Sequence, residues 1–156
     1  PQSVCLKGKL STIWNNLGKE ALDQGYDYIK LMGDDIRIPS DTGWLGLFAN
    51  KLKKNNNIGF SAGWSNNDNI PTQFLVHKTH YEIFGFFYPE EIETWGVDDA
   101  LYQLYPAKYR NWMKSYPLLN VGGSPRYEIT FSEKFVKAIV KRHKPKLARF
   151  LQQLNE

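Results

Sequence analysis

Two pairs of adjacent aspartates are the residues of this sequence whose types and spacing best suit chemistry. Asp34 and Asp35 follow the apolar run "YIKLM", and Asp98 and Asp99 stand in "TWGVDD". Neighbouring carboxylates repel each other unless a cation or water screens them. A pair after a strand suits a hard cation such as Mg²⁺ or Mn²⁺, which takes its other ligands from water and substrate phosphates. A pair at a helix start could supply a general base, because the helix dipole favours ionised carboxylates. Each pair alone also fits an ordinary turn or cap.

Histidines and glycines offer weaker signals. His77 and His80 lie three residues apart in "VHKTH", which would serve a metal or a diphosphate only if the turn aims both rings the same way. We interpret His77 first as a buried, hydrogen-bonded histidine and second as a site residue. In "NVGGSPRYE" the glycines would let the backbone approach a ligand, and Arg126 could clamp a phosphate. The dinucleotide, P-loop and H-E-x-x-H fingerprints are absent from the sequence, which argues against dehydrogenases, P-loop enzymes and zincins.

The composition predicts one soluble domain. The chain has 156 residues, 42% of them apolar, which is enough for a single core, and its one cysteine, Cys5, excludes an internal disulfide. No run approaches the roughly 20 apolar residues of a membrane span, and no signal peptide is recognisable, so we expect a cytoplasmic protein, in the host cytoplasm if the chain is viral.

The net charge of +4 mildly favours anionic partners such as nucleotides. Much of it lies in "KFVKAIVKRHKPKLAR", residues 134–149. We interpret this segment as the solvated face of a helix, in preference to a surface that contacts membrane phosphates or nucleic acid.

The elements that must position the aspartates follow from the spacing of apolar residues. A helix over 8–25 leads into a strand from Tyr26 to Met32, directly before the first acidic pair, and a helix over 97–105 begins with the second. A helix feeding a strand is half of a βαβ unit, in which ligands collect at the carboxyl ends of the strands. The sequence therefore predicts an α/β fold. The other expected elements are a helix from Ser40 or Asp41 to about 57, strands over 58–63, 73–77 and 112–117, a loop over 64–72, a short helix from Thr79, and a final helix from Ser132 to Leu154 with a kink at Pro145.

Two stretches carry a resemblance to a known family. "GKLSTIWNNLGKEALDQGYDYIKLMGDDI" resembles the central part of GT-A glycosyltransferases, especially the family 2-like group, in which a helix with an Asn leads to a strand and the DxD motif, here Gly33-Asp34-Asp35. "TQFLVHKTHYEIFGFFYPEEIETWGVDDALYQLY" is similar to the acceptor-side half of related enzymes of algae and large DNA viruses. The resemblance covers roughly residues 8–130. It implies a GT-A type mixed sheet flanked by helices over 1–131, without the first strands of that fold, and a basic C-terminal helix over 132–156.

The resemblance also implies roles for individual residues. Asp35 would be the main protein ligand of Mn²⁺ or Mg²⁺, and Asp34 would contact the metal or the donor ribose. Asp99 would deprotonate the acceptor hydroxyl with Asp98 in support, which is the inverting scheme, although retention stays open. His77 and Trp95 would line the acceptor or sugar pocket. The implied function is metal-dependent transfer of a sugar from a nucleoside-diphosphate sugar, with UDP-sugar favoured, to a hydroxyl of a glycan or glycoprotein, with no nucleic-acid partner.

Two other functions remain open at this point. A metal-dependent nuclease or phosphoesterase would use the acidic pairs to hold two cations about 4 Å apart and would need no nucleotide sugar. A non-catalytic carbohydrate-binding or nucleic-acid-binding module would use its aromatic residues for stacking and its aspartates as caps. Such a module would be indifferent to Mn²⁺.

Overall fold

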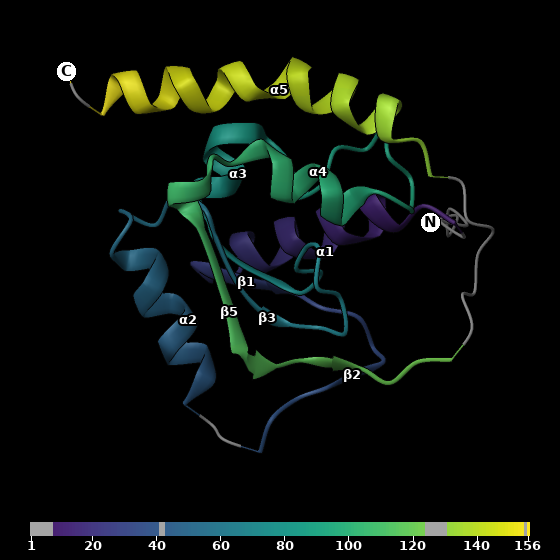
Figure 1. Cartoon of the computed structure of the whole chain (residues 1–156). Coiled ribbons are helices and arrows are strands. Elements are labelled where there is room, and N and C mark those ends of the chain that lie inside the picture. Colours follow the sequence, from purple (N-terminus) through teal and green to yellow (C-terminus); the bar gives the residue numbers. More distant parts are fainter. Residues whose placement is uncertain (1–7, 41–42, 124–130, 155) are drawn as a thin grey trace.

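The computed structural model describes residues 8–40, 43–123, 131–154 and 156 (Figure 1). These residues form a mixed α/β structure, so the predicted class is confirmed. The elements are α1 (Leu10–Asp23), β1 (Tyr28–Leu31), β2 (Ile36–Arg37), α2 (Trp44–Lys53), β3 (Phe60–Trp64), β4 (Phe74–His77), α3 (Thr79–Phe84), α4 (Val97–Leu104), the 3-10 turn η1 (Ala107–Tyr109), β5 (Arg110–Pro117), β6 (Leu119–Asn120) and α5 (Glu133–Gln153).

The main sheet has the strand order β1-β4-β3-β5. Strand β4 runs antiparallel to both of its neighbours, with Tyr28 opposite His77 and Leu31 opposite Phe74, whereas β3 and β5 are parallel. Strands β1, β3 and β5 therefore point the same way. We use the term carboxyl edge for the end of the sheet at which the carboxyl ends of these three strands lie. A second, two-stranded antiparallel sheet pairs β2 with β6.

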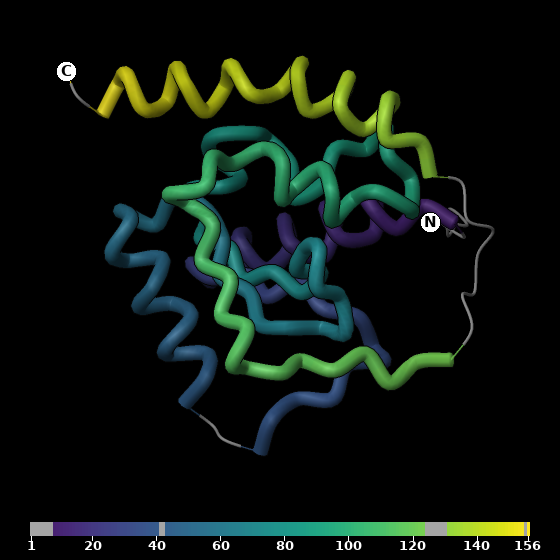
Figure 2. Tube along the Cα trace, in the orientation of Figure 1, coloured from purple at the N-terminus to yellow at the C-terminus, as the bar shows by residue number. Residues whose placement is uncertain are grey.

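Helices cover both faces of the main sheet. The alternation of side chains along β1 sends Ile29 and Leu31 into the larger core, while Tyr28 packs against the smaller one. The larger core joins the sheet to α3, α4 and α5, and the smaller one holds α2 against the opposite face. Figures 1 and 2 show α5 lying along the outside of α3 and α4.

Helix α5 shares the main core through one apolar stripe. Val136, Ile139, Val140 and Leu147 recur at helical spacing and are buried, and the Ser132 hydroxyl accepts a hydrogen bond from the Phe135 amide at 3.3 Å as the N-cap. The helix continues through Pro145 as one element. Among the described residues, no helix combines the length and apolar character needed to cross a membrane.

The structure departs from the sequence predictions in its short and irregular parts. The second helix begins at Trp44 after Gly43, so Ser40 does not cap it, and Asp41 lies outside the described residues. The two-residue strands β2 and β6 were not predicted, because only their pairing with each other defines them. Cys5 and Arg126 also lie outside the described residues.

Candidate functional site at the carboxyl edge

Asp35 lies in a backbone cradle just beyond the end of β1. Its carbonyl oxygen accepts a hydrogen bond from the Val121 amide at 2.9 Å, which joins this loop to the segment after β6. A Cβ atom added at Gly122 would collide with Asp35 Oδ2, and one added at Gly33 would lie 2.7 Å from Oδ1. The half-buried carboxylate is therefore packed between two glycines, whereas Asp34 is exposed. The sequence led us to expect that the glycines of this turn let the backbone approach a ligand. Gly122 instead packs against the carboxylate of Asp35, the residue expected to bind the metal ion.

An asparagine in the loop after β3 fixes this glycine turn. Asn66 adopts a left-handed backbone conformation with φ of 62°. Its side-chain oxygen accepts from the Asn120 amide at 3.0 Å, and its side-chain nitrogen donates to the Asn120 carbonyl at 3.3 Å. Asn120 Oδ1 in turn accepts from the Gly122 amide at 2.9 Å. The loops that follow β1, β3 and β6 are thus tied together at the carboxyl edge. Sequence reasoning missed Asn66, although it lies in the asparagine-rich loop assigned to the surface.

Lys30 and Gln73 hold the same loop from the other side. The Lys30 ammonium donates to the Gln73 carbonyl at 2.7 Å, and Gln73 Oε1 accepts from the Gly33 amide at 3.1 Å. The ammonium also lies 5.6 Å from the Trp44 ring centre and 5.5 Å from that of Phe48. Burial in these surroundings lowers the pKa of Lys30 to about 7. A lysine inside the apolar run "YIKLM" was the signal that could have identified this residue.

The cradle leads to a prediction about Gly122. We expect Gly122→Ala to push the Asp35 carboxylate out of position and to weaken Mn²⁺-dependent nucleotide binding about 10-fold, the usual effect of disturbing the support of a metal ligand. Gly123→Ala is the matched control, because a Cβ there meets nothing within 4 Å. Calorimetric titration of both variants makes the comparison. Equal affinities in the two variants would show that the position of the Asp35 carboxylate is irrelevant to binding.

The second acidic pair stands in the first turn of α4. Gly96, with φ of 96°, precedes this turn, and a Cβ at Gly96 would lie 2.7 Å from Val136 of α5. Helix α4 ends beside the start of β3, where the Tyr105 and Phe60 ring centres are 6.3 Å apart. Figure 1 shows the start of α4 and the β1–β2 connection toward the same, right-hand side of the view, at different heights.

Asp98 and Asp99 have different electrostatic surroundings. Burial, with a further contribution from Asp99, raises the pKa of Asp98 from the ordinary value of 3.8 to about 8, although the Tyr88 hydroxyl donates to it at 3.3 Å. Burial and the nearby Glu133 also raise the pKa of Asp99. At neutral pH Asp98 therefore carries a proton, which relieves the repulsion between the pair. Of the two, Asp99 is the better general-base candidate.

Asn15 positions Tyr88 and so supports the acidic pair. Its side-chain oxygen accepts from the Phe87 amide at 2.8 Å and from the Tyr88 amide at 2.9 Å, and its side-chain nitrogen donates to the Tyr88 carbonyl at 2.8 Å. One buried side chain of α1 thereby fixes the segment that carries the Tyr88 hydroxyl to Asp98. Sequence reasoning assigned no role to Asn15 or Tyr88, because their contacts join residues more than 70 positions apart.

The raised pKa of Asp98 has a consequence for stability. An acid whose folded-state pKa lies above its unfolded value binds more protons when folded, so its contribution to stability falls as pH rises from about 4 to about 8. We expect Asp98→Asn to lack this decrease in stability with rising pH. At pH 8 its free energy of unfolding should exceed that of the wild type by about 1–2 kcal/mol, after allowance for partial exposure. The two proteins should converge near pH 4. Urea unfolding at several pH values measures the difference, and a constant difference between pH 4 and 8 would contradict the shifted pKa.

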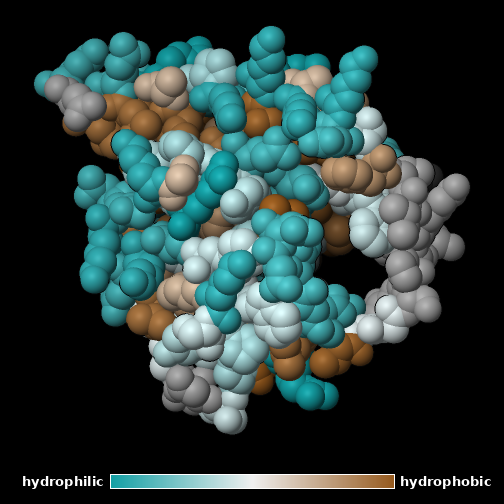
Figure 3. All heavy atoms as spheres, viewed as in Figure 1, coloured by the Kyte–Doolittle hydropathy of each residue, from teal (hydrophilic) through white to brown (hydrophobic). Residues whose placement is uncertain are grey.

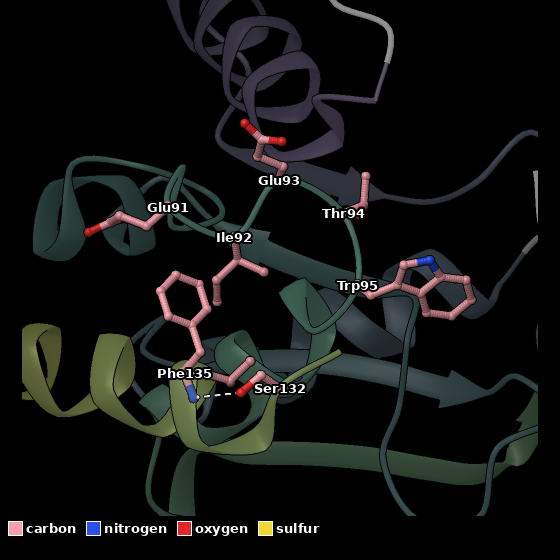
Figure 4. Close-up of a pocket in the computed structure, with 8 residues that line it drawn as sticks. Glu91, Ile92, Glu93, Thr94, Trp95, Ser132 and Phe135 are labelled. Atoms are coloured by element: carbon pink, nitrogen blue, oxygen red, sulfur yellow. Dashed lines mark hydrogen bonds between the residues drawn. The ribbon is translucent and has the colours of Figure 1, made fainter. Parts of the chain in front are cut away.

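Trp95 lies at the rim of a pocket beside α4. The segment 91–95 and the first turn of α5 line this pocket, in which Ile92 and Phe135 point toward each other while the Trp95 ring points away from them (Figure 4). Trp95 is 37% exposed and precedes Gly96 and the second acidic pair in sequence, and its role in lining an acceptor or sugar pocket stays a prediction.

His77 lies at the opposite end of β1 from the Asp34-Asp35 loop. Because β4 runs antiparallel to β1, His77 pairs with Tyr28, the first residue of the strand. Its Nδ1 accepts from the Thr79 amide at 3.2 Å and contacts the Thr79 hydroxyl at 2.7 Å. The interpretation as a buried, hydrogen-bonded histidine is confirmed. Strand direction separates His77 from the Asp34-Asp35 loop, and its predicted place in an acceptor or sugar pocket stays untested.

His80 does not join His77 in a common site. Its Nδ1 contacts the Tyr105 hydroxyl at 2.8 Å and its Nε2 donates to the Phe87 carbonyl at 3.1 Å. Burial lowers the pKa of His80 to about 4, so the ring is neutral. The turn between the two histidines therefore sends their rings to different partners, and the condition for a shared metal or diphosphate site is not met.

A G-x-S-x-G motif that sequence reasoning did not identify has a structural role. Residues 59–63 read GFSAG and fit the G-x-S-x-G pattern of a nucleophile elbow, which requires an exposed serine on a strand-to-helix turn. Ser61 instead lies within β3, is fully buried, and donates to the Phe48 carbonyl at 2.8 Å. It is not placed to act as a nucleophile.

Within the described part of the chain, no group of three or more His, Cys, Asp and Glu side chains is arranged to hold a metal ion. The Asp34-Asp35 loop has two neighbouring carboxyl side chains, one half-buried and one exposed. Comparison with models of known protein families, with curated proteins and with solved structures finds no match for this chain.

Proposed function

We propose that this chain forms the catalytic part of a metal-dependent glycosyltransferase of GT-A type, which moves a sugar from a nucleoside-diphosphate sugar, UDP-sugar in the first instance, to a hydroxyl of a glycan or glycoprotein. The observation that carries the proposal is the Asp35 carboxylate packed between Gly33 and Gly122 in the loop directly after β1, together with the second acidic pair in the first turn of α4. One pair follows β1 and the other opens α4, so donor and acceptor functions have separate candidate residues.

The donor side of the proposed site is the Asp34-Asp35 loop. Asp35 would hold Mn²⁺ or Mg²⁺, and the exposed Asp34 would contact the same ion or the donor ribose. When bound, the ion would neutralise the charge that develops on the departing diphosphate without any proton transfer. The contacts of Gly33 with Gln73 and of Asp35 with Val121 keep this loop in place before the donor arrives.

The acceptor side of the proposed site is the first turn of α4. Asp99 takes the proton of the acceptor hydroxyl as its oxygen bonds to the anomeric carbon of the donor sugar. The bond from that carbon to the diphosphate oxygen breaks, and the nucleoside diphosphate leaves with the electron pair. Attack from the face opposite the leaving group inverts the configuration. Asp98 stays protonated near neutral pH, so it adds no negative charge beside Asp99.

A complete GT-A sheet would need further strands, and β1 offers a place for them. Among the described residues, β1 pairs only with β4, so its outer edge has free backbone groups. Exposed apolar side chains, including Leu17 and Tyr26, line a hollow beside this edge. In this proposal, further strands would extend the sheet from β1 and add to the nucleotide contacts that the Asp34-Asp35 loop makes.

Titration of the protein with UDP and GDP, with and without Mn²⁺, tests the proposal. We expect one nucleotide to bind, and only when Mn²⁺ is present. Phosphodiester cleavage without any nucleotide binding would favour the nuclease alternative, and glycan binding that is indifferent to Mn²⁺ would favour the binding module. Either result would contradict the proposal.

A further inference from the structure

The net positive charge of the chain resides entirely in α5. This helix holds seven of the 20 Lys and Arg residues but only one of the 16 Asp and Glu residues. The rest of the chain therefore has 13 basic and 15 acidic residues and a formal charge of −2. A molecule charged in this way presents one basic surface, and an anionic partner would meet it there.

The structure shows which basic side chains of α5 form that surface. The buried stripe fixes the rotation of the helix, so Lys134, Lys141 and Arg149 fall on the opposite, exposed face, with exposed Lys137 and Lys144 beside them. Figure 3 shows hydrophilic side chains along this outer surface and hydrophobic residues beneath them. Lys137 pairs with Glu133 of the same helix at 2.6 Å, and the remaining two basic residues also have partners within the chain. Lys146 donates to the Phe84 carbonyl at 2.7 Å, and Arg142 pairs with Glu91 at 3.0 Å.

Exposed apolar side chains stand at both ends of the basic stripe. Phe135 is 46% exposed in the first turn, and Phe131 just before the helix is exposed to the same extent. Leu154, just after the helix, is 57% exposed. The apolar stripe of α5 is buried in the core, so the row of basic side chains on its exposed face is the part of the helix that can meet a surface of lipid phosphates.

We propose that α5 docks this protein on a bilayer rich in anionic phospholipids, with the helix parallel to the membrane plane. Helix α5 lies on the outside of the molecule (Figure 2), and its exposed basic side chains recur along its length, which matches a plane of lipid phosphates. A nucleic-acid site would instead combine a basic groove with aromatic side chains interleaved for base stacking, and the exposed aromatics of α5 stand only at its start. This proposal does not rest on the proposed function. It goes beyond the solvated face expected from the sequence.

Co-sedimentation with lipid vesicles tests the proposal. The wild type should bind vesicles that contain about one third phosphatidylserine but not vesicles of phosphatidylcholine alone, and binding should weaken as salt screens the charges. Each basic residue close to an anionic surface strengthens partitioning about five-fold, so we expect the triple variant Lys134→Gln/Lys141→Gln/Arg149→Gln to bind roughly 100-fold more weakly.

A second triple variant provides the matched control. Lys51→Gln/Lys53→Gln/Lys54→Gln removes the same charge from exposed positions of α2 and its C-cap, and should leave vesicle binding nearly unchanged. If both variants lost vesicle binding equally, the net charge of the protein and not the position of its basic residues would explain the binding. If the wild type did not bind vesicles, the proposal would be wrong. If the α5 variant lost binding to a single-stranded RNA but not to vesicles, the surface would be a nucleic-acid site and the proposal would be wrong.

Discussion

Replacement of Asp35 by asparagine is expected to abolish Mn²⁺-dependent nucleotide binding while leaving the fold intact. Asparagine keeps the size of the side chain but loses the charge that a hard cation requires. Loss of a supporting contact around a metal ligand costs about 10- to 100-fold in affinity, so loss of a ligand should reach at least the upper end of that range. The fold should tolerate the change, because the loop is held mainly by backbone groups of Gly33, Asp35 and Val121.

Calorimetry on Asp35→Asn and a control variant would check this expectation. Asp23→Asn is a suitable control, since it removes an equally charged side chain from an exposed position, where Asp23 pairs with Lys19 of the same helix. Titration with UDP or GDP should give wild-type affinity for the control in Mn²⁺ and no measurable binding for Asp35→Asn. If Asp35→Asn retained Mn²⁺-dependent binding, Asp35 would not be a metal ligand. The proposed donor site would then lack its main protein ligand for the ion.

The second large effect is expected for Asp99. Asp99→Asn should leave nucleotide binding nearly unchanged and lower the transfer rate by about 10²- to 10⁴-fold, because an amide cannot accept the proton of the acceptor hydroxyl. Asp98→Asn should cost much less. Asparagine resembles the protonated carboxyl that Asp98 already presents near neutral pH, and it can still accept from the Tyr88 hydroxyl.

Steady-state rates with a fixed donor and a range of acceptors would separate the two aspartates. The raised pKa of Asp99 predicts that the wild-type rate climbs with pH at higher values than an ordinary aspartate base would give, because only the ionised form accepts a proton. Asp99→Asn should lose this rise. A wild-type rate in Asp99→Asn, or a greater loss in Asp98→Asn, would reverse the assignment of the base.

The sequence by itself determined the elements and the residues worth testing. Apolar spacing gave the long helices α1 and α5 and the strands β1, β3 and β4 within a few residues, since a helix or strand must place its apolar side chains on one face to be buried. The type and adjacency of the aspartates were enough to single out both acidic pairs, because neighbouring carboxylates in a loop suit a hard cation and carboxylates at a helix start suit the helix dipole.

Only the tertiary structure decided how these residues are arranged. The antiparallel direction of β4 removed His77 from the edge that holds Asp35, and the packing of Gly122 and Asn66 built the cradle around that carboxylate. The proton on Asp98 and the depressed pKa of Lys30 come from burial by residues distant in the chain. Local periodicity fixes which face of an element is apolar, but strand order, close approaches and desolvation depend on contacts between segments that no local pattern encodes.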